Sequence, residues 1–163
     1  MSVWVWVANI LGWPLIHLTV SWVFMKLDST CFDPNGFFFR ERSWEQGGDF
    51  YLRAFSVKRW KSRLPDGAAW FAGGFAKKKL QRRDTTYLQR FILETCRGEA
   101  AHWVTMSLAP VFFIWNPLWA SAVMLVYAVL ANAPCIIVQR YNRVGLRRLL
   151  NIKVLGRETR LTQ

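Results

Sequence analysis

Apolar residues fall into two long blocks, and charged residues fill the stretches that follow each block. Residues 1–25 and 100–139 contain no Asp, Glu, Lys or Arg. Residues 26–99 hold fifteen Lys or Arg against nine Asp or Glu, and residues 140–163 hold seven against one. An apolar helix of about 20 residues crosses the ~30 Å hydrocarbon core of a bilayer. The alternation predicts an all-α integral membrane protein that forms a single membrane domain over residues 1–163.

The first apolar block predicts one transmembrane helix over residues 3–25. A cleaved signal peptide is the alternative, since such peptides are also N-terminal and apolar. The uncleaved helix is favoured because the basic n-region is missing and the first Lys, Lys26, comes after the run. Positive charge collects on the cytoplasmic side of membrane proteins, so the N-terminus is expected outside.

The second apolar block predicts a helical hairpin, because Asn116-Pro117 is a pair that favours a turn. The first limb, residues 100–115, spans about 24 Å as a helix, so it either begins earlier or re-enters the membrane. The second limb, residues 118–138, is long enough to cross. We therefore expect about three membrane segments, with the N-terminus outside and the C-terminus in the cytoplasm.

The basic regions are expected to be cytoplasmic or interfacial and to contain amphipathic helices. Gly47-Gly48 is expected to break a short helix. In residues 68–83 an apolar stretch with Trp70 and Phe75 precedes a cationic cluster, a pattern typical of a segment on an anionic membrane surface. Positive-inside charge without any ligand explains the pattern equally well. The basic regions are residues 26–99 and 139–163, and the lipid-surface candidates are Lys77, Lys78, Lys79, Arg82 and Arg83.

Neither a metal centre nor a nucleic-acid interface is expected. The three cysteines lack metal-finger spacing, and there are only two histidines. The net charge of +12 is explained by the positive-inside rule, so it does not require a nucleic-acid partner. We expect no bound cofactor, and the sequence leaves the oligomeric state open.

The residues best suited to catalysis lie in a stretch with a helical pattern, residues 84–102. Glu99 is three residues before His102, and Glu94 is about two turns before it, so both carboxylates can approach the imidazole. A carboxylate beside a histidine orients the ring and raises its basicity, as acyl transfer to an alcohol requires. A structurally incidental interfacial histidine is equally consistent. Cys96 as an acyl-accepting nucleophile is less favoured, because it lies off that helical face.

Other polar groups are candidates for binding a substrate. Arg97 is expected to steady an oxyanion or a headgroup. Asn132 interrupts the last membrane segment and could face a cavity lined by headgroups. Arginine grips phosphate or carboxylate through paired donors. The substrate-binding candidates are Arg40, Arg42, Asn132, Arg140, Asn142 and Arg143.

Several long motifs resemble those of a known family. They are FRERSWEQGGDFY, VKRWKSRLPDGAAWFAGGFAKKKL, ETCRGEAAHW, WNP and NAPCIIVQRYNR, within residues 37–150. They resemble the small bacterial membrane family named after glycosyl-4,4'-diaponeurosporenoate acyltransferase. The resemblance implies transfer of a fatty acyl group to a sugar hydroxyl of a glycosylated carotenoid, the closing step of a staphyloxanthin-like pathway. It also implies acyl-CoA or acyl carrier protein as co-substrate, membrane lipids as surroundings, and the bacterial inner membrane as location.

The resemblance does not identify the acyl acceptor, because a related isoprenoid glycoside or glycolipid fits the same chemistry. The HxxxxD motif of other acyltransferases is absent, so any catalytic machinery must differ from theirs. A second interpretation rests on RGE, NP and QRYNR across a short hairpin, which resembles small membrane methyltransferases of the isoprenylcysteine type. A third is a non-catalytic subunit that binds anionic lipid through its Lys and Arg clusters.

Overall fold

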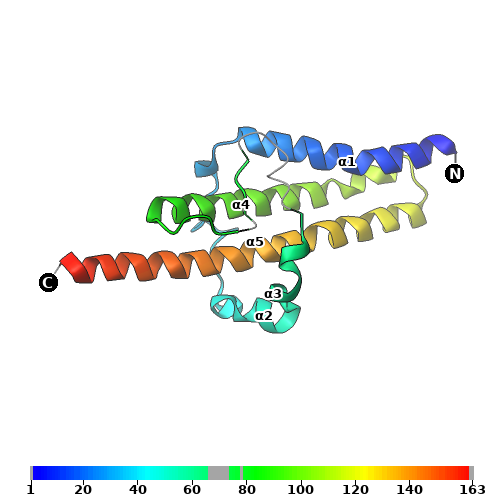
Figure 1. The fold of residues 1–163 in the computed structure, drawn as a ribbon. Helices are drawn as coiled ribbons and strands as arrows, with labels where there is room; N and C mark the ends of the chain where they lie inside the picture. The colour runs from blue at the N-terminus through cyan, green and yellow to red at the C-terminus, as the bar shows by residue number, and fades with distance from the viewer. Residues whose placement is uncertain (1, 66–73, 78, 162–163) are drawn as a thin grey trace.

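The computed structural model describes residues 2–65, 74–77 and 79–161, and of residues 156–161 only the helical backbone. All regular structure among these residues is helical, as predicted. Three long helices, α1 (Val3–Lys26), α4 (Thr85–Ser107) and α5 (Leu118–Leu161), lie alongside one another with α4 in the middle (Figure 1). The N-terminus and the α4–α5 connection lie at one end of this bundle, and the C-terminus lies at the other.

The short helices of residues 43–60 lie on the side of α5 that faces away from α1, whereas the 3-10 turn of residues 29–31 contacts α4 (Figure 1). Gln46, Gly47 and Gly48 have φ angles of 49°, 63° and 97°, which separates a 3-10 turn from the helix after it. Glycine avoids the steric cost of a Cβ at positive φ, so the predicted break at Gly47-Gly48 is confirmed. The short elements are η1 (Ser29–Cys31), η2 (Ser43–Gly48), α2 (Asp49–Phe55), α3 (Val57–Trp60) and η3 (Lys61–Arg63).

Helix α4 begins and ends where its local sequence requires. The Asp84 side chain accepts a hydrogen bond from the Tyr87 backbone N–H at 2.9 Å and caps the first turn. At the other end Pro110 has no N–H to donate, and its ring clashes with a preceding helical turn. The helix therefore ends at Ser107, and the 3-10 helix η5 (Ala109–Ile114) follows. The first limb predicted over residues 100–115 is thus divided between two elements.

The predicted turn at Asn116-Pro117 is present, and α5 begins at the next residue, Leu118. Helix α5 continues through Pro134 to Leu161, so the predicted membrane limb and the basic tail form one helix. Its 44 residues span about 66 Å at 1.5 Å per residue. This single element extends from the apolar end of the bundle to the basic end.

By length and composition, two helices among the described residues could cross a membrane: α1 and the Leu118–Leu155 part of α5. Their apolar windows are only 17% and 22% buried inside the protein. The exposed side chains are large and apolar, such as Ile10 and Leu130, which are 66% and 69% exposed. Residues 100–115, the third predicted segment, do not form a helix of that length.

The apolar end of the bundle is held together by aromatic packing and neutral amides. Trp13 of α1 stacks on Phe112 of η5 with ring centroids 4.8 Å apart. Asn9 and Asn116 exchange two side-chain hydrogen bonds of 2.8 Å, and Trp115 Nε1 donates to Asn9 Oδ1 at 2.9 Å. These contacts fix α1 against the α4–α5 connection without burying an ion.

Candidate functional site

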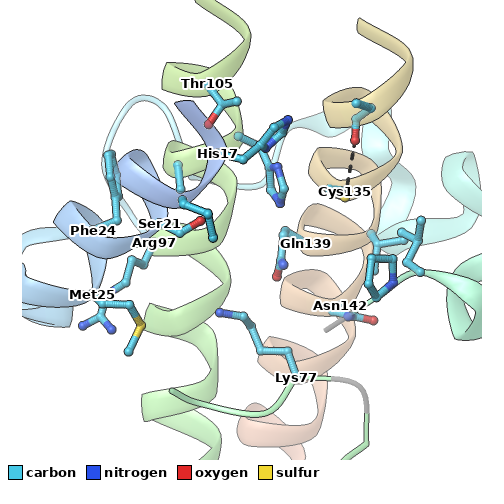
Figure 2. Close-up of a pocket in the computed structure, with 18 of the residues that line it drawn as sticks. His17, Ser21, Phe24, Met25, Lys77, Arg97, Thr105, Cys135, Gln139 and Asn142 are labelled. Atoms are coloured by element: carbon cyan, nitrogen blue, oxygen red, sulfur yellow. Dashed lines mark hydrogen bonds between the residues drawn. The ribbon is translucent and has the colours of Figure 1, made fainter. Parts of the chain in front are cut away.

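A cavity of about 550 Å³ lies between α1, α4 and α5 (Figure 2). Its polarity changes along its length, because His17 and Thr105 lie at one end while Lys77 and Asn142 lie at the other. We call the end lined by Lys61, Lys77, Arg97 and Asn142 the mouth. Much of the wall between the two ends is apolar and includes Leu18, Phe24, Met25, Ala101, Ala131 and Val138. Such a lining suits a lipid chain whose polar group stays near the mouth.

His102 of α4 lines this cavity, and Asn132 of α5 fixes its tautomer. The Asn132 side chain is buried, and its Nδ2 donates to the Ala128 carbonyl at 2.9 Å. Its Oδ1, which can only accept, therefore faces His102 Nδ1 at 3.0 Å. His102 then carries its proton on Nδ1, which leaves the lone pair of Nε2 to accept a proton.

The carboxylates that the sequence suggested as partners of His102 bind cations instead. Glu99 is buried and accepts from Arg140 at 3.0 Å and from Arg143 at 2.5 Å. Glu94 is also buried and pairs with Arg97 at 3.0 Å. Within the described part of the chain, neither carboxylate hydrogen-bonds to His102. The side chain that contacts His102 Nδ1 is the amide of Asn132, where we expected a carboxylate.

Arg140 joins two buried carboxylates from distant parts of the sequence. Its Nη1 donates to Glu99, while its Nε donates to Glu45 of η2 at 3.1 Å. Tyr51 Oη and the Arg42 backbone N–H also donate to Glu45. The network fixes the short helices on α5 and orients the α4–α5 pair. A buried ion pair is stable only when the remaining donors and acceptors are also satisfied, as they are around Glu45.

These contacts change the acidity of the groups involved. Burial alone would raise the pKa of Glu45, but hydrogen bonds from Arg140, Tyr51 and the Arg42 backbone hold this pKa below its ordinary value. Burial, followed by the contact with Glu45, raises the pKa of Tyr51. Burial also raises the pKa of the Cys96 thiol, although the nearby Arg143 opposes the rise. A raised pKa disfavours the thiolate, which argues against Cys96 as an activated nucleophile.

The predicted substrate-binding residues divide between the cavity and other surroundings. Asn142 lines the mouth, and Asn132 reaches the cavity through His102. Arg143 is buried against Glu99 and the Phe39 ring, as part of the network with Arg140. Arg40 and Arg42 lie over the Phe37 ring, and neither lines the cavity.

The predicted lipid-surface cations are also divided. Lys77 lines the mouth and lies 3.9 Å from Glu94. Arg82 pairs with Asp84 at 2.9 Å on the exposed surface. Lys79 and Arg83 are exposed, and Lys78 lies outside the described residues. No group of three or more His, Cys, Asp or Glu side chains among the described residues could hold a metal ion.

The sequence also matches known proteins over most of its length. The model of the family described as "Glycosyl-4,4'-diaponeurosporenoate acyltransferase" matches residues 34–152. This chain belongs to that acyltransferase family. Relatives of that name from Staphylococcus aureus strains USA300 and NCTC 8325 / PS 47 are 30% identical over 140 residues, which is 86% of this chain and 84% of each relative. The relative from strain MRSA252 is 29% identical over the same length. No solved structure matches the chain.

Membership of the acyltransferase family confirms the resemblance seen in the motifs and makes this chain an enzyme. The matched region includes His102, Asn132 and the cationic mouth, whereas α1 precedes it. The family match therefore covers two of the three helices that enclose the cavity.

Sequence reasoning did not select His17 or Lys61, two cavity residues with ionisable side chains. Spacing along the chain gives no link between His17 and His102. A second histidine within an uncharged apolar run was the available signal. Lys61 lies in one of the long family motifs but looked like one positive-inside charge among many. Only the folded chain brings it to the mouth.

Proposed function

We propose that this family member is a membrane-embedded acyltransferase. It moves a fatty acyl group onto a sugar hydroxyl of a glycosylated isoprenoid or carotenoid, or of a related glycolipid. The cavity between α1, α4 and α5 is its reaction chamber. The observation that carries this proposal is the histidine in the wall of an apolar cavity, with Nδ1 held by Asn132 and Nε2 left as a base.

Membrane embedding is supported by the two apolar helices, whose large side chains remain exposed in the isolated chain. In a bilayer these side chains contact lipid tails instead of water. The charged network around Arg140 then lies near the cytoplasmic interface, in agreement with the positive-inside rule. The acceptor enters from lipid, and the acyl donor arrives from the cytoplasm at the mouth.

In the proposed reaction, His102 Nε2 takes the proton of the sugar hydroxyl while the hydroxyl oxygen attacks the carbonyl carbon of an acyl thioester. The new C–O bond forms, and the tetrahedral intermediate collapses with cleavage of the C–S bond. The leaving thiolate takes the proton from the imidazolium, which restores the neutral ring. Asn132 keeps the correct tautomer during each turnover, and Arg97 at the mouth holds the polar part of a substrate.

The test is acyl transfer in membranes that contain the full-length chain, an acyl thioester and a glycosylated isoprenoid acceptor. His102→Ala should reduce product formation by at least about 100-fold, because it removes the base. His17→Ala is the matched control, since this second histidine lines the same cavity but has no assigned proton transfer. Unchanged product with His102→Ala would refute the base. Methyl transfer from an S-adenosyl donor without any acyl transfer would refute the proposal in favour of the methyltransferase interpretation.

A further inference from the structure

A second cleft of about 530 Å³ lies next to the mouth. It is enclosed by α2, α3, η3 and the C-terminal half of α5, together with Lys77, Leu80 and Phe91. Lys61, Lys77, Val138 and Asn142 line both this cleft and the cavity that contains His102. The two spaces are therefore neighbours with four lining residues in common.

The lining of the cleft is cationic. Lys58, Lys61, Lys77 and Arg148 line it, and Asp49 supplies the one carboxylate among the described lining residues. These cations come from three parts of the sequence, because Lys58 and Lys61 are neighbours while Lys77 and Arg148 are distant, and the three parts meet only in the folded chain. Apolar side chains, including Leu52, Phe91 and Leu146, also line the cleft. A ligand with several phosphates and a flat ring matches this combination.

Lys61 is the cation that most needs an anionic ligand. Its Nζ donates to Asn142 Oδ1 at 3.2 Å and lies 4.9 Å from the Tyr141 ring centroid. Within the described residues, Lys61 forms no ion pair with a carboxylate. Burial, and then the neighbouring Lys58, lower the pKa of the Lys61 ammonium. A partly buried ammonium without an anion is costly, and a bound phosphate removes that cost.

Gly145 of α5 also lines this cleft. A Cβ added there would meet no atom within 4 Å, so packing does not require glycine at this position. Glycine inside a helix costs about 1 kcal/mol relative to alanine. The open space above Gly145 is therefore kept at a cost to helix stability, as expected for a position that a ligand covers.

We propose that this cleft binds the nucleotide and phosphates of a coenzyme A thioester, with the acyl chain extending past Lys61 into the His102 cavity. The inference rests on the proposed acyl transfer and identifies its donor. A carrier protein would bring one phosphodiester to the mouth and would leave the cleft without a ligand. The four cations and the apolar side chains of the lining favour the small nucleotide-bearing donor.

Binding is measured by calorimetry with the purified full-length chain in zwitterionic detergent micelles. Coenzyme A should bind saturably, 3'-dephospho-coenzyme A about tenfold more weakly, and pantetheine more weakly still, because each loses charge-assisted hydrogen bonds. The affinity should fall as salt is raised. Equal affinity for coenzyme A and pantetheine would overturn the proposal.

Matched variants distinguish binding in the cleft from nonspecific attraction of coenzyme A to positive charge. Lys61→Gln should weaken coenzyme A binding about tenfold. Arg59→Gln removes an exposed charge from the same segment but does not line the cleft, and should change the affinity by less than about twofold. Gly145→Leu fills the cleft with a good helix former, so it should abolish binding without lowering the thermal midpoint. Equal effects of Lys61→Gln and Arg59→Gln would overturn the proposal.

Lipid phosphate is the other possible source of an anion. If phosphatidylglycerol copurifies with the chain, is lost in Gly145→Leu, and no coenzyme A binds, the cleft is a headgroup site and the donor assignment is wrong. Transfer from acyl carrier protein without coenzyme A binding would overturn the inference but leave the proposed function intact. Saturable coenzyme A binding without any acyl transfer would support the cleft and overturn the proposed function.

Discussion

The two ends of the α4–α5 pair are held by different interactions. At the apolar end, Asn9, Asn116 and Trp115 share neutral hydrogen bonds beside stacked rings. At the basic end, Arg140 and Glu99 belong to a buried network of full charges. This contrast agrees with the proposed membrane placement, because lipid does not solvate ions and a charged network is stable only near water. The cavity lies between the apolar and the charged end, with His17 near one end and Lys77 at the other.

The largest effect is expected from breaking the charged end. Glu99→Gln leaves Arg140 and Arg143 buried with less negative charge nearby, which should cost about 3–5 kcal/mol of stability. Denaturant unfolding in detergent, followed by Trp fluorescence, measures the loss. Arg82→Gln is the control because it removes an ion pair on the exposed surface, and its unfolding should match the unaltered chain. Equal unfolding of Glu99→Gln and the control would show that the network does not hold this end.

A second prediction concerns Asn132, which lies between the apolar and the charged end of the bundle. Asn132→Leu removes the acceptor that keeps the proton on His102 Nδ1. Turnover should fall about 100-fold, because the wrong tautomer places a proton on Nε2. KM for the acyl donor should stay within about twofold, since Asn132 does not line the mouth. Steady-state kinetics separate the two effects, and a rise in KM with unchanged kcat would contradict a positioning role.

A smaller effect is expected at the apolar end. Asn116→Ala removes the neutral partner of Asn9 and should cost about 1–2 kcal/mol. The same unfolding measurement applies, and the loss should be smaller than for Glu99→Gln. An equal or larger loss would contradict the contrast between the two ends.

The smallest effect concerns acidity at the charged end. The folded-state pKa of Glu45 lies below its ordinary value, so its contribution to stability is present above the unfolded pKa and is lost as pH falls through the folded pKa. The thermal midpoint should therefore decrease as pH falls below about 4. Glu45→Gln should flatten this decrease when midpoints are compared across the same buffers. An identical pH profile for the variant would exclude Glu45 as the source.

The local sequence was enough to predict where a helix or turn lies when nearby residues determine its ends. The uncharged run predicted α1, and Asn116-Pro117 predicted the turn before α5. Proline alone was ambiguous, because α4 ends shortly before Pro110 while α5 continues through Pro134. Local sequence therefore does not distinguish a proline that ends a helix from one that lies inside it.

The sequence predicted which residues belong to the candidate site, but not which of them contact one another. His102 was found because a polar ring in an uncharged run is costly, and Asn132 for a similar reason. Their contact joins residues 30 positions apart, so it depends on the register of α4 against α5. Glu99 was assigned to His102 by helical spacing, but its cationic partners, Arg140 and Arg143, are 41 and 44 positions away. Spacing within one helix could not reveal these competing cations.

The continuity of α5 sets a length requirement for the donor. Asn132 and Asn142 are ten residues apart on one unbroken helix, which fixes them about 15 Å apart along its axis. A ligand held by its phosphates beside Asn142 must present its reactive carbonyl at that distance to meet His102. One residue inserted between these asparagines would rotate the basic half of α5 by about 100° and turn the anion-binding side away from the reaction chamber.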